Sequence, residues 1–197
     1  MKEYLKSCQT DFWKHVFEKE LEYVLRELNG CKNVLSIGCG PAVIERGLQE
    51  GGFNVTGLDI SREALEGIPD NIRTLIGSAE DLDISNSSFD AVIYIASLQF
   101  INDYEKSIQE TRRILRPRGK FLAMLLNPES QFFKEKMKQP DSYVTKIKHA
   151  NLRPIEEIAI KYFEIIGEYF LGIRDRETFP TDDSKLASLY VIKGARK

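Results

Sequence analysis

Apolar residues recur at two different spacings along this chain, and the change from one to the other predicts its architecture. Residues 11–28 carry Phe12, Val16, Leu21 and further apolar residues three or four positions apart, which predicts an amphipathic helix that Asn29-Gly30 ends. Short apolar runs then predict strands at about 33–38, 53–59, 72–77, 89–95 and 119–126, with helices near 41–50, 61–67 and 103–115. Strands separated by helices form a parallel sheet with right-handed crossovers. A ligand is therefore expected at the carboxyl ends of these strands.

The tail departs from this alternation. Residues 129–138 and 154–161 have helical spacing, whereas residues 142–149 alternate as a strand would. Two apolar segments, residues 162–173 and 186–193, then flank a polar loop with no helical pattern between them. Successive strands without an intervening helix pair antiparallel, so these segments predict a terminal hairpin.

Composition fits one globular domain over residues 1–197. The chain has 42% hydrophobic residues and a net charge of -2, which argues against disorder and against a polyanion-binding protein. Cys8, Cys31 and Cys39 are an odd set without C-x-x-C spacing, so neither a disulfide framework nor a metal site is expected. The residues give no signal-peptide pattern and no apolar run of membrane-spanning length. A cytoplasmic location is the expectation.

A glycine turn follows the first predicted strand. Gly38 and Gly40 lack a Cβ, so the backbone can turn sharply there and approach a ligand. Pro41 suits the first turn of the next helix. Asp59 lies about twenty residues on, at the end of the second strand, where a carboxylate can accept both hydroxyls of a ribose. The spacing fits neither a dinucleotide fingerprint, whose third glycine would fall at Val43, nor a P-loop.

Three stretches resemble the class I S-adenosylmethionine-dependent methyltransferases. The run Ser36-Ile37-Gly38-Cys39-Gly40-Pro41-Ala42 is similar to their motif I, with Ser36 in place of the usual acid. Residues 77–82 and 88–93 resemble the family's G-D-A-x-x-L…F-D-x-V segment, and residues 110–119 resemble its junction between a helix and the fifth strand. The resemblance implies a Rossmann-like α/β fold: a mostly parallel seven-stranded sheet, helices on both faces and a C-terminal antiparallel hairpin.

The resemblance also implies a cofactor, S-adenosylmethionine, with S-adenosylhomocysteine as product. Asp59 would hold its ribose, Ile60 and Ala79 would pack on the adenine, and Ser78 stands where an acid often binds the adenine amino group. The expected cofactor-binding residues are Ser36, Gly38, Cys39, Gly40, Asp59, Ile60, Ser78, Ala79, Glu80 and Tyr94.

Catalytic residues are less clearly indicated. Tyr94 and Gln99, in the loop region after the fourth strand, are candidates to orient a substrate, and His149 is a candidate base because its ordinary pKa lies near neutrality. For each, packing or capping is the alternative role. Residues 1–30 are expected to form a helical lid, with Tyr4, Phe12 and Trp13 as candidate contacts, and residues 127–161 to cover the substrate.

These patterns lead to a methyltransferase that acts on a small molecule. Lysines from Lys134 to Lys148 favour an acceptor that carries a carboxylate or phosphate, although a solvated charged face is the alternative. A protein or RNA methyltransferase is a second hypothesis, but the slightly acidic balance makes a nucleic-acid partner unfavourable. A non-catalytic cofactor-binding regulatory subunit is a third, because Ser36 and Ser78 replace acids. The oligomeric state is not indicated.

Overall fold

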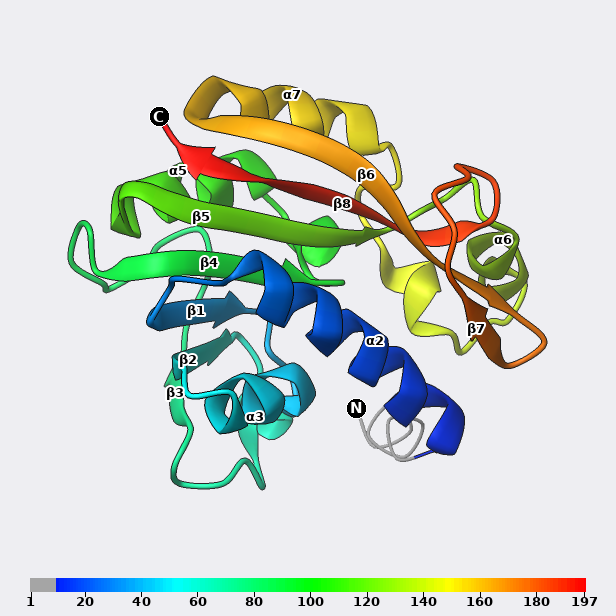
Figure 1. Ribbon diagram of the computed structural model, residues 1–197, viewed down its shortest axis with the longest axis horizontal. Coiled ribbons are helices and arrows are strands. Elements are labelled where there is room, and N and C mark those ends of the chain that lie inside the picture. The colour runs from blue at the N-terminus through cyan, green and yellow to red at the C-terminus, as the bar shows by residue number, and fades with distance from the viewer. Residues whose placement is uncertain (1–9) are drawn as a thin grey trace.

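The computed structural model describes residues 10–197. Their strands form one eight-stranded sheet in the order β3-β2-β1-β4-β5-β8-β6-β7 (Figure 1). The parallel part consists of β1 (Asn33–Ile37), β2 (Asn54–Asp59), β3 (Arg73–Ile76), β4 (Phe89–Ile95) and β5 (Leu115–Leu126). Strand β1 lies between β2 and β4, so the chain reverses its direction of strand addition there. This reversal opens a crevice at the carboxyl ends of the strands, where α/β proteins bind ligands.

The antiparallel part confirms the predicted terminal hairpin. Strand β8 (Ala187–Arg196) pairs with both β5 and β6 (Phe163–Arg174), antiparallel in each case. The structure adds one short strand to the expected seven, β7 (Glu177–Phe179), which pairs with the end of β6. Asp175 and Arg176 connect these two strands, and both have positive φ, as a tight hairpin turn requires.

Helices cover both faces of the sheet (Figure 1). One face carries α2 (Asp11–Glu27) and α3 (Val43–Glu50), and α6 (Gln131–Met137) joins the same apolar cluster near the beginning of β8. The other face carries α5 (Tyr104–Ile114) and α7 (Leu152–Tyr162), which contact each other. The short helices are α4 (Arg62–Leu65), η1 (Leu98–Phe100) and η2 (Tyr143–Lys146). None of the helices within residues 10–197 is both long enough and apolar enough to cross a bilayer.

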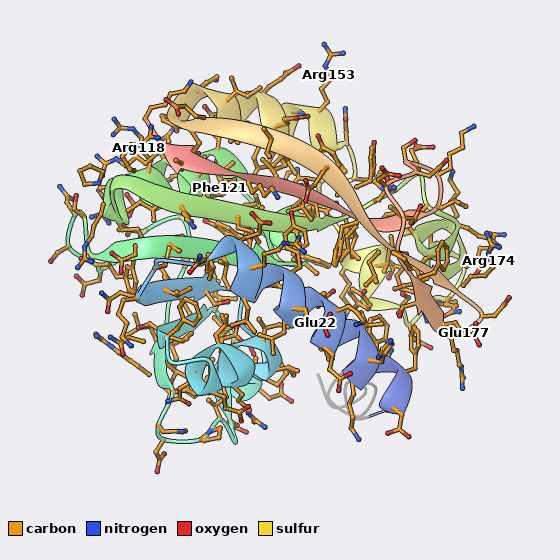
Figure 2. The ribbon with its side chains drawn as sticks, in the orientation of Figure 1. Glu22, Arg118, Phe121, Arg153, Arg174 and Glu177 are labelled. Carbon is orange, nitrogen blue, oxygen red and sulfur yellow. The ribbon has the colours of Figure 1, made fainter. Side chains whose placement is uncertain are left out.

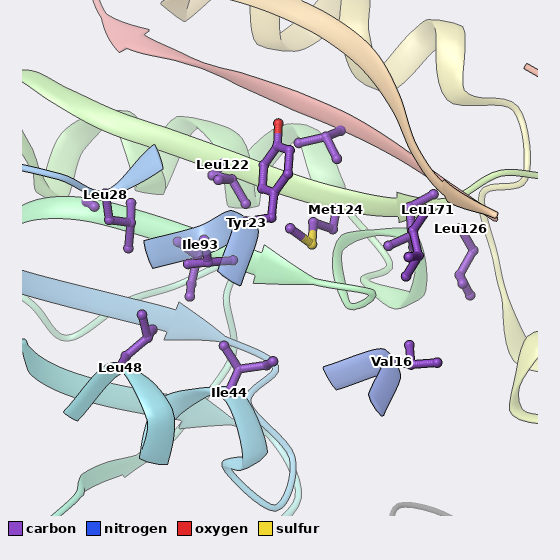
Figure 3. Close-up of a cluster of buried hydrophobic side chains, with 14 of the residues drawn as sticks. Val16, Tyr23, Leu28, Ile44, Leu48, Ile93, Leu122, Met124, Leu126 and Leu171 are labelled. Atoms are coloured by element: carbon purple, nitrogen blue, oxygen red, sulfur yellow. The ribbon is translucent and has the colours of Figure 1, made fainter. Parts of the chain in front are cut away.

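The core beneath α2 fixes how that helix sits on the sheet. Val16 and Tyr23 of α2 and its C-cap residue Leu28 belong to the same buried apolar cluster as Leu122 and Met124 of β5 (Figure 3). All five side chains are at most 2% exposed. Burying such side chains contributes about 1.5–3 kcal/mol each, so α2 is held firmly across the strand ends.

Two local predictions were wrong. Residues 142–149 contain the short helix η2 rather than a strand, because the Ser142 hydroxyl accepts the Val144 N–H and starts a helical turn. Pro41 is not in the first turn of a helix: α3 begins at Val43, and its cap, Ala42, has φ 57°. The predicted cap at Ser61 is confirmed, since its hydroxyl accepts the Ala64 N–H.

Candidate functional site

A cavity of about 490 Å³ lies at the carboxyl ends of the parallel strands. Its wall includes the last residues of three strands, Ile37 of β1, Leu58 and Asp59 of β2, and Ile95 of β4. The other wall comes from α2 and from residues beyond β5. The cavity therefore lies in the crevice that the strand order creates.

The glycine turn forms one side of this cavity. Gly38 has φ +72°, and a Cβ there would lie 2.5 Å from the Cβ of Ser97. Gly40 has φ +53°, and no atom lies within 4 Å of the place where its Cβ would stand. Glycine at both positions keeps the turn unstrained and leaves its backbone open to a ligand.

Asp59 holds the turn in place. Its Oδ2 accepts the Gly40 N–H at 2.9 Å, and its Oδ1 accepts the Ser61 N–H at 2.9 Å. A carboxyl oxygen has room for a second hydrogen bond, so Asp59 can also accept hydroxyls of a ribose. Ile60, next to it, is 76% exposed and lines the cavity. An exposed aliphatic side chain beside a carboxylate fits an adenosine group.

Most of the expected cofactor-binding residues lie at the cavity. The lining includes Gly38, Gly40, Asp59, Ile60, Ser78, Ala79 and Glu80. Ser78 accepts the Glu80 N–H at 3.1 Å, and Glu80 accepts the Asp103 N–H at 3.0 Å, which fixes the loop after β3. The donor and acceptor groups present here fit S-adenosylmethionine.

Ser36 and Cys39 are not part of the lining. Ser36 is buried and donates its hydroxyl to Glu45 Oε1 at 2.5 Å. Burial raises the pKa of the Glu45 carboxyl to about 7. Cys39 packs against the backbone of Gly57, where a Cβ would lie 2.7 Å from its sulfur. Burial raises the pKa of the Cys39 thiol, which therefore stays protonated and unreactive near neutrality.

None of the three catalytic candidates lines the cavity. Tyr94 is fully buried, and its hydroxyl bonds to Ser107 Oγ at 2.8 Å and Thr111 Oγ1 at 2.6 Å on α5. The even residues of β4 point away from α2, whereas a pocket contact would need the opposite face. Tyr94 therefore packs against α5 and lines neither the cofactor side nor the substrate side of the cavity.

Gln99 and His149 hold loops together. Gln99 donates to the carbonyls of Leu126 at 3.1 Å and His149 at 3.3 Å, and accepts the Leu126 N–H at 2.6 Å. The His149 Nε2 bonds to the carbonyls of Ile101 at 2.9 Å and Asn102 at 3.1 Å. Because carbonyls only accept, this nitrogen carries a proton and donates it.

The remaining wall is aromatic and comes from the two segments expected to cover the site. Trp13 and Phe17 of α2 line it together with Phe132 and Tyr143 from beyond β5. The Trp13 ring lies 6.1 Å from that of Phe132 and 6.5 Å from that of Tyr143, both edge to face. Phe12 packs into the neighbouring core, and Tyr4 falls outside the described residues.

Two polar side chains of the cavity were not predicted from the sequence. Glu20 of α2 and Ser188 of β8 line it, and both are buried, at 6% and 1% exposure. Neither Glu20 Oε2 nor Ser188 Oγ has a hydrogen-bond partner among residues 10–197. Burial raises the pKa of the Glu20 carboxyl to about 8. A signal for Glu20 did exist, because it stands between Val16 and Val24 on the buried stripe of the helix.

The lysines of residues 134–148 are divided between the cavity and the surface. Lys146 and Lys148 line the cavity and are exposed. Lys148 donates to Asn102 Oδ1 at 2.6 Å. Lys134 instead pairs with Glu129 at 3.3 Å outside the lining.

Comparisons with known proteins agree with this geometry. The family model for a methyltransferase domain matches residues 35–123. A ubiquinone biosynthesis O-methyltransferase of Dechloromonas aromatica is 28% identical over 171 residues, which cover 72% of this chain and 73% of that protein. A sterol 4-C-methyltransferase of Caenorhabditis elegans is 27% identical over 118 residues, covering 55% of this chain and 35% of the relative. This chain spans between a third and a half of the length of some curated relatives, such as the sterol enzyme and an archaeal protein of Methanocaldococcus jannaschii at 50%.

Solved structures share the fold over nearly the whole chain. A SAM-dependent methyltransferase of Thermotoga maritima, described as a possible histamine N-methyltransferase, superposes with a TM-score of 0.82 at 20% identity. The superposition covers 100% of this chain and 95% of the Thermotoga maritima chain. A SAM-dependent methyltransferase of Archaeoglobus fulgidus gives a TM-score of 0.78 at 13% identity, over 93% of this chain and 94% of its own. The match to residues 35–123 shows a methyltransferase domain in this chain, and the superpositions show that the chain has the fold of S-adenosylmethionine-dependent methyltransferases.

Proposed function

We propose that this protein transfers the methyl group of S-adenosylmethionine to a small-molecule acceptor, and that it does so in the cytoplasm. One observation carries the proposal: one cavity joins the side formed by Asp59 and the glycine turn to an aromatic compartment, which is lined by Trp13, Phe17, Phe132 and Tyr143. The first side has the groups that a nucleoside needs, and the second has space and apolar surface for an acceptor. A cavity of about 490 Å³ falls within the range of small-molecule sites.

The chain's own residues would act by positioning. S-adenosylmethionine, when bound, supplies a methyl group that its positively charged sulfur already activates. Asp59 would orient the ribose, and the turn at residues 38–40 would leave room for the methionyl part. Trp13 and Phe132 would hold the acceptor and exclude water. Alignment of two reactants in one cavity is itself a large source of rate acceleration.

The absence of the three candidate residues from the lining supports a reaction without a dedicated histidine or tyrosine base. The same observation favours a second candidate function, a regulatory subunit that binds the cofactor and transfers nothing. The exposed Lys146 and Lys148 support an acceptor with an acidic group at the solvent end of the cavity. A protein or RNA acceptor lacks such a specific observation.

Calorimetry and turnover together test the proposal. We expect S-adenosylmethionine and S-adenosylhomocysteine to bind at one site, and NAD not to bind. Release of S-adenosylhomocysteine is then followed with a library of small acceptors. Binding without release for any acceptor would favour the regulatory subunit, whereas failure of both cofactor forms to bind would overturn the assignment.

A further inference from the structure

The aromatic compartment has a polar group without a partner at its buried side. Glu20 Oε2 is buried and unpartnered, and the hydroxyl oxygen of Ser188, another lining residue, is in the same state. These two atoms are the unpartnered buried side-chain oxygens and nitrogens found within residues 10–197. Leaving such a group without a hydrogen bond is unfavourable, and more so when it is charged. Both residues lie where a ligand could supply the missing bond.

The ionised form of Glu20 limits which ligand group can bind it. A carboxylate accepts hydrogen bonds and gives none, so in that form its partner must be an N–H or O–H group. The two lysines of the lining are exposed, and Lys148 is bound to Asn102, whereas Glu20 is only 6% exposed. No ion pair of the described residues includes Glu20. An ionised Glu20 therefore lacks a compensating cation among residues 10–197, which agrees with the raised pKa of its carboxyl, and a cationic ligand would favour the charged form.

The surroundings of Glu20 favour a cation on an apolar body. Trp13, Val16, Phe17 and Glu20 follow one another at helical spacing, so they share one face of α2. Trp13 and Phe17 have ring centroids 5.9 Å apart, and Phe132 adds a third ring edge to face with Trp13. The faces of aromatic rings attract ammonium groups, while the rest of the wall accepts hydrocarbon.

We infer that Glu20 binds an ammonium group of the acceptor, and that the part of the acceptor inside the aromatic compartment is an apolar amine; the acidic group proposed above would lie at the solvent end, beside Lys146 and Lys148. The inference rests on the proposed function, because it assigns the acceptor compartment of the same site. Glu20 is a binding residue in this proposal, and the ammonium group that it holds need not be the atom that receives the methyl group. The methionyl ammonium of the cofactor is a second source of the same chemistry, so the test has an arm for each.

Trp13 makes the test direct, because it is the chain's one tryptophan and it lines the compartment. Its fluorescence is titrated with primary amines from butylamine to octylamine and with 2-phenylethylamine. The carboxylic acids and alcohols of matching length serve as comparison ligands. Each titration is run with and without saturating S-adenosylhomocysteine. The proteins are wild type, Glu20→Gln and the control Glu22→Gln, whose carboxylate lies on the exposed side of the same helix (Figure 2).

We expect at least one amine to bind wild type about tenfold or more tightly than its matched acid and alcohol. Glu20→Gln should remove this preference, because an uncharged amide keeps the size of the side chain and loses the ion pair. Glu22→Gln should keep it within about twofold. Thermal unfolding checks that both variants fold.

Two results would overturn the inference. One is an equal affinity for amines, acids and alcohols across the whole series in wild type. The other is a Glu20→Gln variant that retains the amine preference but loses affinity for S-adenosylhomocysteine in calorimetry, which would assign Glu20 to the cofactor. If wild type bound amines selectively but not S-adenosylhomocysteine, the proposed function would fail and the amine site would stand.

Discussion

Ser36 donates a hydrogen bond of 2.5 Å to Glu45, so the position that usually holds an acid in this family contacts an acid nine residues further along the chain. Both side chains are buried, at 1% and 2% exposure. The carboxylate therefore lies behind the glycine turn, outside the cavity lining, and the serine is its donor. The family's acid is replaced here by a serine–glutamate pair.

Ser36→Ala should destabilise the protein by about 1–3 kcal/mol, because it leaves a buried carboxylate without this donor. The hydrogen bond favours the charged form of Glu45, whose pKa burial raises to about 7. The loss should therefore be larger at pH 9 than at pH 5. Urea denaturation at the two pH values measures it. In a Glu45→Gln background the same serine change should cost less and depend little on pH; an equal cost in both backgrounds would contradict the pairing.

Asp59→Ala should weaken binding of S-adenosylhomocysteine by about 1.5–3 kcal/mol, or roughly ten- to a hundredfold. The change removes the ribose acceptor and also the partner of the Gly40 and Ser61 N–H groups. Calorimetry gives the affinity. Glu63→Gln is the control, since Glu63 is exposed, does not line the cavity and lies on α4 close by. Unchanged affinity in a folded Asp59→Ala protein would remove Asp59 from the site.

Glu20→Gln should make the stability of the protein less dependent on pH. The folded-state pKa of Glu20 is about 8, above its ordinary 4.5, so the folded protein keeps a proton that the unfolded chain loses. Stability from this group is present below about pH 4.5 and is lost as the pH rises through 8. At pH 9 the variant should gain on the order of 3 kcal/mol over wild type, and little at pH 5. Denaturant unfolding of both proteins at pH 5 and pH 9 measures this. An equal difference in unfolding free energy between variant and wild type at the two pH values would refute the prediction.

Gln99→Ala should lower stability by about 1–3 kcal/mol, because it frees buried backbone groups of Leu126 and His149. Turnover should fall with it through poorer positioning, while affinity for S-adenosylhomocysteine stays nearly intact.

His149→Ala should retain most turnover, since its Nε2 donates to two backbone carbonyls. Steady-state kinetics separates kcat from KM. Complete loss of turnover in a folded His149→Ala protein would make the histidine the base.

The sequence predicted the parts of the fold that depend on local chemistry. The glycine turn, the acid at Asp59 and the terminal hairpin each follow from a backbone or pairing requirement that the residues reveal. Strand β7 was missed because its turn uses Asp175 and Arg176 at positive φ, where glycine or asparagine is the usual signal.

The sequence placed most of the expected cofactor-binding residues at what the structure shows to be a cavity, and it missed Glu20 and Ser188 of the same lining. Residues of a motif lie near one another in the chain, so Gly38, Gly40 and Asp59 could be identified together. Glu20 and Ser188 come from α2 and β8, far apart in the chain, and only the folding of these elements brings both residues to one cavity. Tyr94 and Gln99 were nominated by their position near the end of the fourth strand. Alternation of the strand faces turns Tyr94 away from the cavity, and Gln99 lies in η1, where its amide binds the backbone of Leu126 and His149.

The position of β8 between β5 and β6 has a consequence for biosynthesis. Translation proceeds from the N-terminus, so this inner strand leaves the ribosome after the strands on both sides of it. Until then β5 and β6 lack their shared neighbour, and their unpaired edges are open to other chains. Ser188 and Leu189, which close one wall of the cavity, also arrive with it. The cavity is thus completed in the same event that joins the two parts of the sheet.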